Sequence, residues 1–419
     1  MSLLRTGLCL LLAGSVLAFG GVEVWAQSPI EIGAAALFVF WAVLTALKPV
    51  GRIYWSPLNW PLLGFIAIGL IQLAFHLTAY TFLTRTQLLK LAAYFLIFFL
   101  VMQAFRTRGE LTKLAWFLII FCFAVSLFAI IQHFTSTAEI YWTETFKTEA
   151  DPFGPYVNRN HFAGFVELTL PVGLAMMAFR GIHRDVVPLM VLLTIVPMSA
   201  LVLSASRGGI VGFAFEVGFL TLLVLKRRAR AWKSSRPIGA GVVALIALMT
   251  VTWVGADQAI TRFSALKSPD VTFARRASMA RGAAHIFFDH PILGCGIGTL
   301  VDVFPRYETA YDAKVVDHVH NDYMEALAET GLLGALCGTT FLGLLYREAR
   351  RIFAMEQGHF SRALHAGAIV AISGMLLHSL VDFNLHIPAN AMLFLLQAYL
   401  ATAPALQSNL HSQPRVRTP

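Results

Sequence analysis

Runs of apolar residues long enough to cross a lipid bilayer recur along the whole chain. A transmembrane helix needs about 20 mainly apolar residues, and within a bilayer every backbone N–H and C=O must be paired inside the chain. The pattern predicts twelve helical spans, at roughly residues 4–20, 31–47, 58–76, 87–105, 112–133, 161–179, 187–204, 208–225, 238–256, 331–346, 363–381 and 387–403. The composition agrees, because 57% of the residues are hydrophobic and only 13% are charged. We therefore predict an all-α integral membrane protein, a bundle of about 12 transmembrane helices.

Basic residues concentrate in alternate loops between these spans, whereas the other short loops hold few cations and more acids. The basic set comprises Lys48, Arg52, Arg106, Arg108, Lys113, Arg180, Arg184, the cluster at 226–236, Arg347, Arg350, Arg351, Arg362, Arg415 and Arg417. By the positive-inside rule these loops and both termini are expected to be cytoplasmic. The net charge of +9 is then a topology signal, and it does not indicate a nucleic-acid partner.

This topology puts two longer loops on the outer face, at about 133–159 and 256–330. The second lies between predicted helices 9 and 10, and its residues 273–288 have the spacing of a short helix that lies on the membrane surface. We divide the chain into residues 1–153, with the first five helices and the first loop, and 154–419, expected to be the catalytic region. The first 28 residues also fit a secretory signal peptide, but a retained first helix gives the even number of spans that the charges favour.

The stretch "HVHNDYMEALAETGLLG" places histidines and acids at the outer end of a predicted helix. Asp322 can cap a helix that carries Glu325 in its first turn, and Gly331 suits the left-handed end of that helix. His320 would then lie at the mouth of the bundle, where an imidazole can take a proton from a hydroxyl. Alternatively, His318 and His320 are solvated loop residues, or they bind a metal together with Asp317 and Asp322.

Arginines on the same face suggest a second group of functional residues. Arg207 occupies a turn of a few residues between two spans, and its planar guanidinium suits pyrophosphate oxygens. Arg276 and Arg281 lie on the predicted surface helix and fit the same role. Simpler interpretations are an arginine that anchors the membrane interface and arginines that bind anionic lipid headgroups. Glu167 and Glu216 lie within spans, where acids are functional candidates or structurally paired, and His378 is interpreted as an interior histidine.

Several motifs resemble, in order, those of the O-antigen ligase and O-antigen polymerase superfamily. His320 and Asn321, nine residues, Gly331, two residues and Gly334 reproduce its His-Asn-x9-Gly-x-x-Gly pattern. Further similar segments are 154–173 with Asn158 and Asn160, Ser206 to Gly209 in "SRGG", Arg276 fifteen residues before Pro291, and 378–390 with Asp382. Where the family usually carries a tryptophan four residues after that arginine, this chain has Ala280.

The resemblance implies a glycosyltransferase of the bacterial inner membrane, with an active site that faces the periplasm. Its donor would be a glycan on undecaprenyl pyrophosphate, and its acceptor a glycan or lipid A–core, as in lipopolysaccharide or exopolysaccharide biosynthesis. We assign catalysis to His320, Arg207 and Arg276, and substrate binding to Asn158, Asn160, Ser206, Asn321, Asp382 and Arg281. No cofactor or metal is expected, and the chain has no GxxxxGK[ST] nucleotide loop. Polymerase or exopolysaccharide transfer is favoured slightly over ligation to lipid A–core. A transporter is a more distant alternative, and the chain shows no matching halves with interrupted helices.

Overall fold

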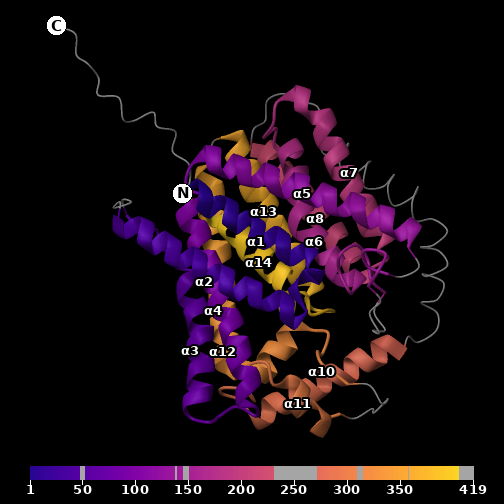
Figure 1. Ribbon diagram of the computed structural model, residues 1–419. Coiled ribbons are helices and arrows are strands. Elements are labelled where there is room, and N and C mark those ends of the chain that lie inside the picture. Colours follow the sequence, from indigo (N-terminus) through magenta and orange to yellow (C-terminus); the bar gives the residue numbers. More distant parts are fainter. Residues whose placement is uncertain are drawn as a thin grey trace.

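The computed structural model describes residues 1–47, 52–136, 139–144, 151–230, 271–308, 315–356 and 358–404. Its α-helices are α1 (Ser2–Leu17), α2 (Val24–Leu47), α3 (Asn59–Ala74), α4 (Thr81–Ala104), α5 (Arg108–Thr135), α6 (Arg159–Ala178), α7 (Val187–Leu203), α8 (Arg207–Arg230), α10 (Val271–Asp289), α11 (Leu300–Val303), α12 (Asp322–Met355), α13 (His359–His378) and α14 (Pro388–Thr402). Short 3-10 turns connect several of them, including η5 (Asn384–His386). Figure 1 shows their arrangement.

The helical bundle predicted from hydropathy is confirmed for the described part of the chain. Eleven of the twelve predicted spans coincide with helices there, and the span at 238–256 lies outside the described residues. Eight of these helices are long and apolar enough to cross a membrane, and α1 and α3 are shorter apolar helices. The total of twelve membrane spans therefore stays a prediction. The first helix is part of the bundle, because α1 packs against α2, α4 and α14.

Helices α6, α13 and α14 form the centre of the bundle. All fifteen residues of α14 are buried, and α6 packs against α5, α7, α8, α13 and α14. A helix that is apolar on every side belongs in such an interior position, since it has no face to give to solvent. Both α6 and α14 begin at the same end of the bundle, and this arrangement brings their first residues together.

The basic ends of the helices gather at the opposite end of the bundle. The side chain of Arg5 donates to the carbonyl of Ala104 at 2.9 Å, and Arg106 donates to the carbonyl of Arg52 at 3.0 Å. Arg108 lies over the ring of Phe360, 5.7 Å from its centroid. These contacts bring together the loop residues that the charge pattern assigns to one side of the membrane.

The short helix predicted at 273–288 is present as α10, which lies with α11 at one end of the molecule beside α12 (Figure 1). Its position on the membrane surface stays a prediction. Its buried face carries Met279, Ala283 and Ile286, whereas Phe288 near its end is 72% exposed. One face of α10 therefore packs on the protein, and Phe288 stays outside that contact.

The glycine-rich bend after α10 fits against a kink in α12. Helical geometry is interrupted at Gly331, with φ +61°, although α12 then continues to Met355 instead of ending there. A methyl group on Gly331 would lie 2.5 Å from the carbonyl carbon and oxygen of Ile292, so only glycine allows this approach. The Gln72 amide closes the contact, donating to the carbonyls of Leu293 and Glu329 at 2.6 and 2.9 Å.

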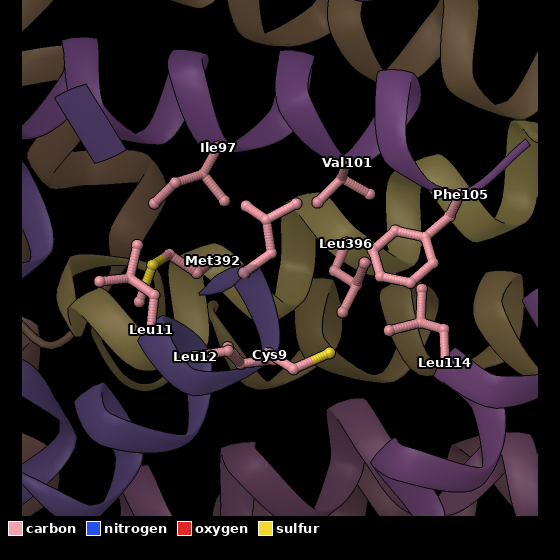
Figure 2. Close-up of a pocket in the computed structure, with 10 residues that line it drawn as sticks. Cys9, Leu11, Leu12, Ile97, Val101, Phe105, Leu114, Met392 and Leu396 are labelled. Carbon is pink, nitrogen blue, oxygen red and sulfur yellow. The ribbon is translucent and has the colours of Figure 1, made fainter. Parts of the chain in front are cut away.

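A small apolar pocket lies between α1, α4, α5 and α14 (Figure 2). Its volume is about 20 Å³, and it is lined by Leu8, Cys9, Leu11, Leu12, Ile97, Val101, Phe105, Leu114, Met392 and Leu396. Apart from the Cys9 thiol, these side chains are hydrocarbon or thioether groups. We interpret this pocket as a packing gap among apolar helices.

Candidate functional site

A cleft of about 810 Å³ opens at the end of the bundle opposite the basic loops. Its walls come from the first turns of α2 and α6, from the second and third turns of α4, from α10, from the segment before α12, and from the turn before α14. Polar side chains that line it include Gln27, Gln87, Lys90, Asp151, Asn158, Arg159, Asn160, His161, Arg275, Arg276, Asp317, His318, His320 and His386. The volume and the polar walls suit a hydrophilic ligand of several sugar rings' size.

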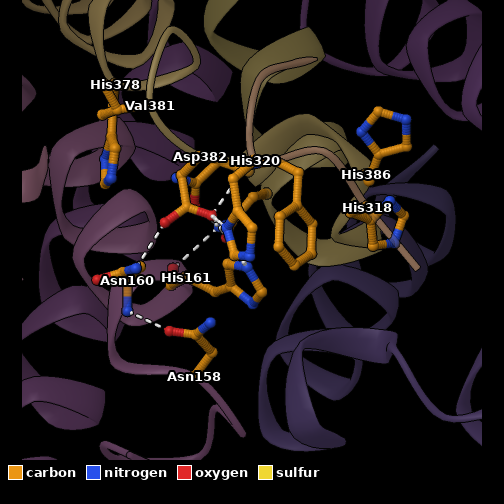
Figure 3. A network of polar contacts seen from close by, with 12 residues as sticks. Asn158, Asn160, His161, His318, His320, His378, Val381, Asp382 and His386 are labelled. Carbon is orange, nitrogen blue, oxygen red and sulfur yellow. Dashed lines mark hydrogen bonds and ion pairs between the residues drawn. The ribbon is translucent and has the colours of Figure 1, made fainter. Parts of the chain in front are cut away.

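The carboxylate of Asp382 joins the polar groups at the floor of this cleft. Its side chain is 1% exposed, and it accepts hydrogen bonds from the amide of Asn160 at 2.6 Å and from the backbone N–H of Phe383 at 2.9 Å. Nδ1 of His320 lies 3.3 Å from the same carboxylate, and Nε2 of His161 lies 3.9 Å from it. Figure 3 shows Asp382 between Asn160 and His320.

The surroundings of Asp382 keep it ionised. Burial alone would raise the pKa of this carboxyl, but the hydrogen bond with His320 and the nearby imidazole of His161 hold its pKa well below the ordinary value. An ionised carboxylate only accepts hydrogen bonds. Nδ1 of His320 must therefore carry a proton in this contact, which leaves Nε2 as the ring atom that can exchange a proton with a ligand.

Local backbone geometry sets the position of His320. This residue has φ +52°, in the left-handed region that non-glycine residues rarely adopt. The next residue, Asn321, caps α12 by accepting the backbone N–H groups of Tyr323 and Met324. The expected cap at Asp322 is thus wrong by one residue, because the Asp322 carboxylate instead accepts from the imidazole of His386 at 2.7 Å.

Arg276 brings a positive charge to the rim of the cleft. One guanidinium nitrogen donates to the carbonyl of Val381 at 2.6 Å, and another lies 4.0 Å from the Asp382 carboxylate. These contacts fix the guanidinium of Arg276 against the turn that carries Asp382. Arg275, from the same turn of α10, also lines the cleft.

A second polar cluster, made by His318, Asp322, Glu325 and His386, lies in the wall of the cleft. Nδ1 of His318 is 2.6 Å and Nε2 of His386 is 3.2 Å from the same oxygen of Glu325. Burial alone would lower the pKa of His386, but the charge of Glu325 and the hydrogen bond with Asp322 raise it to about 9. Our alternative metal set of His318, His320, Asp317 and Asp322 does not assemble, since His318 and His320 turn to different carboxylates.

The ring of Phe383 separates the two clusters. It stacks on His318 with centroids 4.3 Å apart, and it meets His320 and His161 edge-on at 4.9 and 4.7 Å. One aromatic side chain thus fixes three imidazole rings in orientation, and the histidines of the two clusters point to different parts of the cleft (Figure 3).

The structure brings together some of the predicted site residues and not others. Asn158, Asn160, Arg276 and His320 line the cleft, with Asp382 beneath them. Four others do not line it: Asn321 is the cap of α12, Ser206 is buried and accepts the backbone N–H of Gly209, and Arg207 and Arg281 are exposed.

Arg207 nevertheless begins α8 close to the turn that carries Asp382. The neighbouring Gly208 lies against His378, where an added methyl group would be 2.5 Å from Nε2 of the ring. His378 is the interior histidine that we expected, bonded through Nδ1 to Glu167 at 2.5 Å. Glu216 is buried near the same carboxylate, so both intramembrane acids belong to the interior and not to the cleft.

Residues from the first half of the chain also line the cleft, and sequence reasoning missed them. Gln27 of α2 and Gln87 and Lys90 of α4 face it. Lys90 carried a usable signal, because a lysine inside an apolar span is costly unless it reaches a polar region.

Comparison with known families supports the resemblance. A family model described as O-antigen ligase matches residues 189–339. This range runs from α7 to the kinked part of α12 and contains Arg207, Arg276 and His320. About a third of the chain is therefore similar to the O-antigen ligase family, and the eight long apolar helices are those of a multi-pass membrane protein. No curated protein matches the chain.

Proposed function

We propose that this protein transfers a glycan from undecaprenyl pyrophosphate to an acceptor hydroxyl at the periplasmic face of a bacterial inner membrane. The observation that carries this proposal is the pairing of His320 with the ionised Asp382 at the floor of a polar cleft that Arg276 borders. A proton acceptor and a fixed positive charge at one cleft are what transfer from a pyrophosphate donor requires.

The reaction is a single displacement at the anomeric carbon. The acceptor oxygen forms a bond to this carbon as the bond to the pyrophosphate oxygen breaks, and the electron pair leaves with the pyrophosphate. The proton of the acceptor hydroxyl passes to Nε2 of His320, whose Nδ1–H is held by Asp382. One displacement inverts the configuration of the sugar.

The departing pyrophosphate gains negative charge, and arginine stabilises it. Arg276 is already fixed by Val381, so its guanidinium needs little reorganisation to act on the developing charge. We assign Arg207 the same task from the other side of the turn at 378–382, which Gly208 contacts through His378 and Val381. Asn158, Asn160, Ser206, Asn321 and Arg281 are proposed to support the donor or acceptor. With arginine in this role, the transfer needs no metal ion at the pyrophosphate.

The orientation follows from the distribution of charge. The basic helix ends gather opposite the cleft, and by the positive-inside rule this distribution supports a periplasmic cleft and cytoplasmic termini. In this arrangement residues 154–419 form the catalytic region, and residues 1–153 add helices that complete the cleft wall with Gln87 and Lys90.

We favour growth of a lipid-linked or exopolysaccharide chain over ligation to lipid A–core. The test uses purified protein, undecaprenyl-pyrophosphate-linked glycans and EDTA, with separation of the products on a gel. Longer lipid-linked chains support polymerisation, and lipid A-linked products identify a ligase. Loss of turnover in EDTA, restored by a metal, would contradict metal-independent transfer.

In Arg207→Ala we expect a large loss of turnover with normal membrane insertion, and near-normal turnover would refute the role of Arg207.

A further inference from the structure

Three side chains in the second cluster converge in a way that the transfer reaction does not use. One ring nitrogen each from His318 and His386, and one carboxylate oxygen from Glu325, all lie within 4.8 Å of one another. His318 and Glu325 come from adjacent segments, the stretch before α12 and the first turn of α12, and His386 comes from the distant turn before α14.

We propose that His318, Glu325 and His386 bind a divalent transition-metal ion of the Zn²⁺ type. Two imidazole nitrogens and one carboxylate oxygen are a ligand set that zinc adopts in proteins, with a fourth position left for water. The inference goes beyond the proposed transfer reaction and does not depend on it, because the ion takes no part in the displacement.

Neighbouring groups orient His386 and Glu325 so that each side chain offers one atom to a metal ion. Asp322 accepts from Nδ1 of His386 at 2.7 Å, which directs Nε2 of that ring toward Glu325. This carboxylate–histidine pair is the arrangement that commonly supports a metal-binding imidazole. The backbone N–H of Val319 occupies one oxygen of Glu325 at 3.0 Å and leaves the other oxygen, which both histidines approach.

Two of the three separations between ligand atoms are close to those of a tetrahedral site. Zinc bonds of about 2.0–2.2 Å to nitrogen and oxygen put neighbouring ligand atoms about 3.3 Å apart. The separation between His386 Nε2 and Glu325 is already 3.2 Å. Nδ1 of His318 lies 2.6 Å from the same oxygen of Glu325. The imidazole of His318 would therefore have to move outward by less than about 1 Å to reach the ~3.3 Å separation of a tetrahedral site.

Without metal, protons on the imidazoles bridge these same atoms, and the ion would replace them. His318 and His386 both line the cleft, so the fourth position would face its interior. The bound ion would join the segments on either side of His320 and Asp382. The ion would add to the stability of the fold, and transfer would continue without it in EDTA.

The experiment titrates Zn²⁺ into metal-stripped full-length protein in lipid nanodiscs, without substrate, and measures stoichiometry by calorimetry and the change in melting temperature. Co²⁺ is titrated in parallel, because its visible absorption reports tetrahedral nitrogen and oxygen ligands. We expect one ion per chain, a higher melting temperature and a tetrahedral Co²⁺ spectrum.

Two variants locate the ion. Glu325→Gln should abolish the Co²⁺ spectrum, and Asp322→Asn should weaken Zn²⁺ affinity about 10- to 100-fold. Asp322→Asn retains all three ligands and serves if Glu325→Gln fails to fold. Glu348→Gln, on the same helix but distant from the cleft, is the control and should bind like the wild type.

The absence of saturable Zn²⁺ binding, or unchanged binding in a folded Glu325→Gln or Asp322→Asn variant, would overturn the proposal. Turnover is measured separately on the same preparations with lipid-linked donor. A protein that transfers glycan but binds no ion refutes only the metal site, and one that binds the ion but transfers nothing refutes only the proposed function.

Discussion

Replacement of Asp382 by asparagine tests whether His320 works as a base oriented by a carboxylate. The two oxygens of Asp382 accept from His320, Asn160 and the backbone of Phe383. An asparagine has one acceptor oxygen and one donor NH₂ group. If its NH₂ faces Asn160, two donors oppose each other. If its NH₂ faces His320, the imidazole must accept at Nδ1 and carry its proton on Nε2, where the base is needed.

The expected loss is large because either arrangement damages the catalytic geometry. General base catalysis contributes about 10²- to 10⁴-fold, so we expect turnover to fall at least about 100-fold, or about 2.7 kcal/mol of barrier. Loss of hydrogen bonds to a buried charge should also lower the free energy of unfolding by about 1–3 kcal/mol. The fall in turnover must therefore be measured on protein shown to be folded.

The assay follows undecaprenyl pyrophosphate release by purified protein, with kcat and KM determined separately. Asp289→Asn is the control, because this exposed acid accepts a hydrogen bond from the hydroxyl of Tyr307 at 2.6 Å and is not among the residues that line the cleft. A tautomer effect lowers kcat with little change in KM, whereas a distorted cleft raises KM as well. A folded Asp382→Asn protein with turnover within about threefold of wild type, against the ~100-fold expected, would refute the reasoning.

Three further predictions follow from the same geometry. Arg276→Lys should lower kcat about 10-fold or more in the release assay, since an ammonium cannot reproduce the planar guanidinium, and a wild-type kcat would refute this. Because the pKa of Asp382 is lowered in the folded protein, its ionised carboxylate stabilises the fold fully above the ordinary pKa of 3.8 and progressively less as the pH falls below that value. The difference in melting temperature between wild type and Asp382→Asn should therefore shrink only in strong acid. A difference that shrinks near neutral pH would contradict this prediction. Gly331→Ala should lower the free energy of unfolding by about 2 kcal/mol or more, because Gly331 has a positive φ and an added methyl group would lie 2.5 Å from the backbone of Ile292. Gly343→Ala is the control and should not destabilise the protein, because a methyl group added there meets no neighbouring atom within 4 Å.

The helices could be predicted from the sequence because the bilayer leaves one solution for a long apolar run. Hydropathy located α14 and α6 within a few residues, and spacing located α10. A positive φ at Gly331 was also predicted, as the left-handed end of a helix, but the continuation of α12 beyond a kink and the reason for that kink were not. That reason is the contact with Ile292, which lies 39 positions earlier in the chain.

The partners within the site could not be predicted, because they depend on how the helix ends meet. His318 and His320 are two residues apart, yet one turns to Glu325 and the other to Asp382. No local pattern distinguishes Asn321 from Asp322 as the cap, since either residue type can serve. The place of Lys90 in the cleft wall required the packing of α4 beside the later helices.

The most direct test of the account compares wild type with His320→Ala. Both proteins, purified and shown to be folded, receive the same undecaprenyl-pyrophosphate-linked glycan and acceptor in the presence of EDTA, and undecaprenyl pyrophosphate release is followed over time. The account predicts steady release by the wild type and a loss of about 100-fold or more in the variant. Comparable release by both proteins would show that His320 is not the base. No release by either protein with any supplied acceptor, together with movement of the lipid-linked glycan across vesicle membranes, would contradict the transferase assignment and favour a transporter.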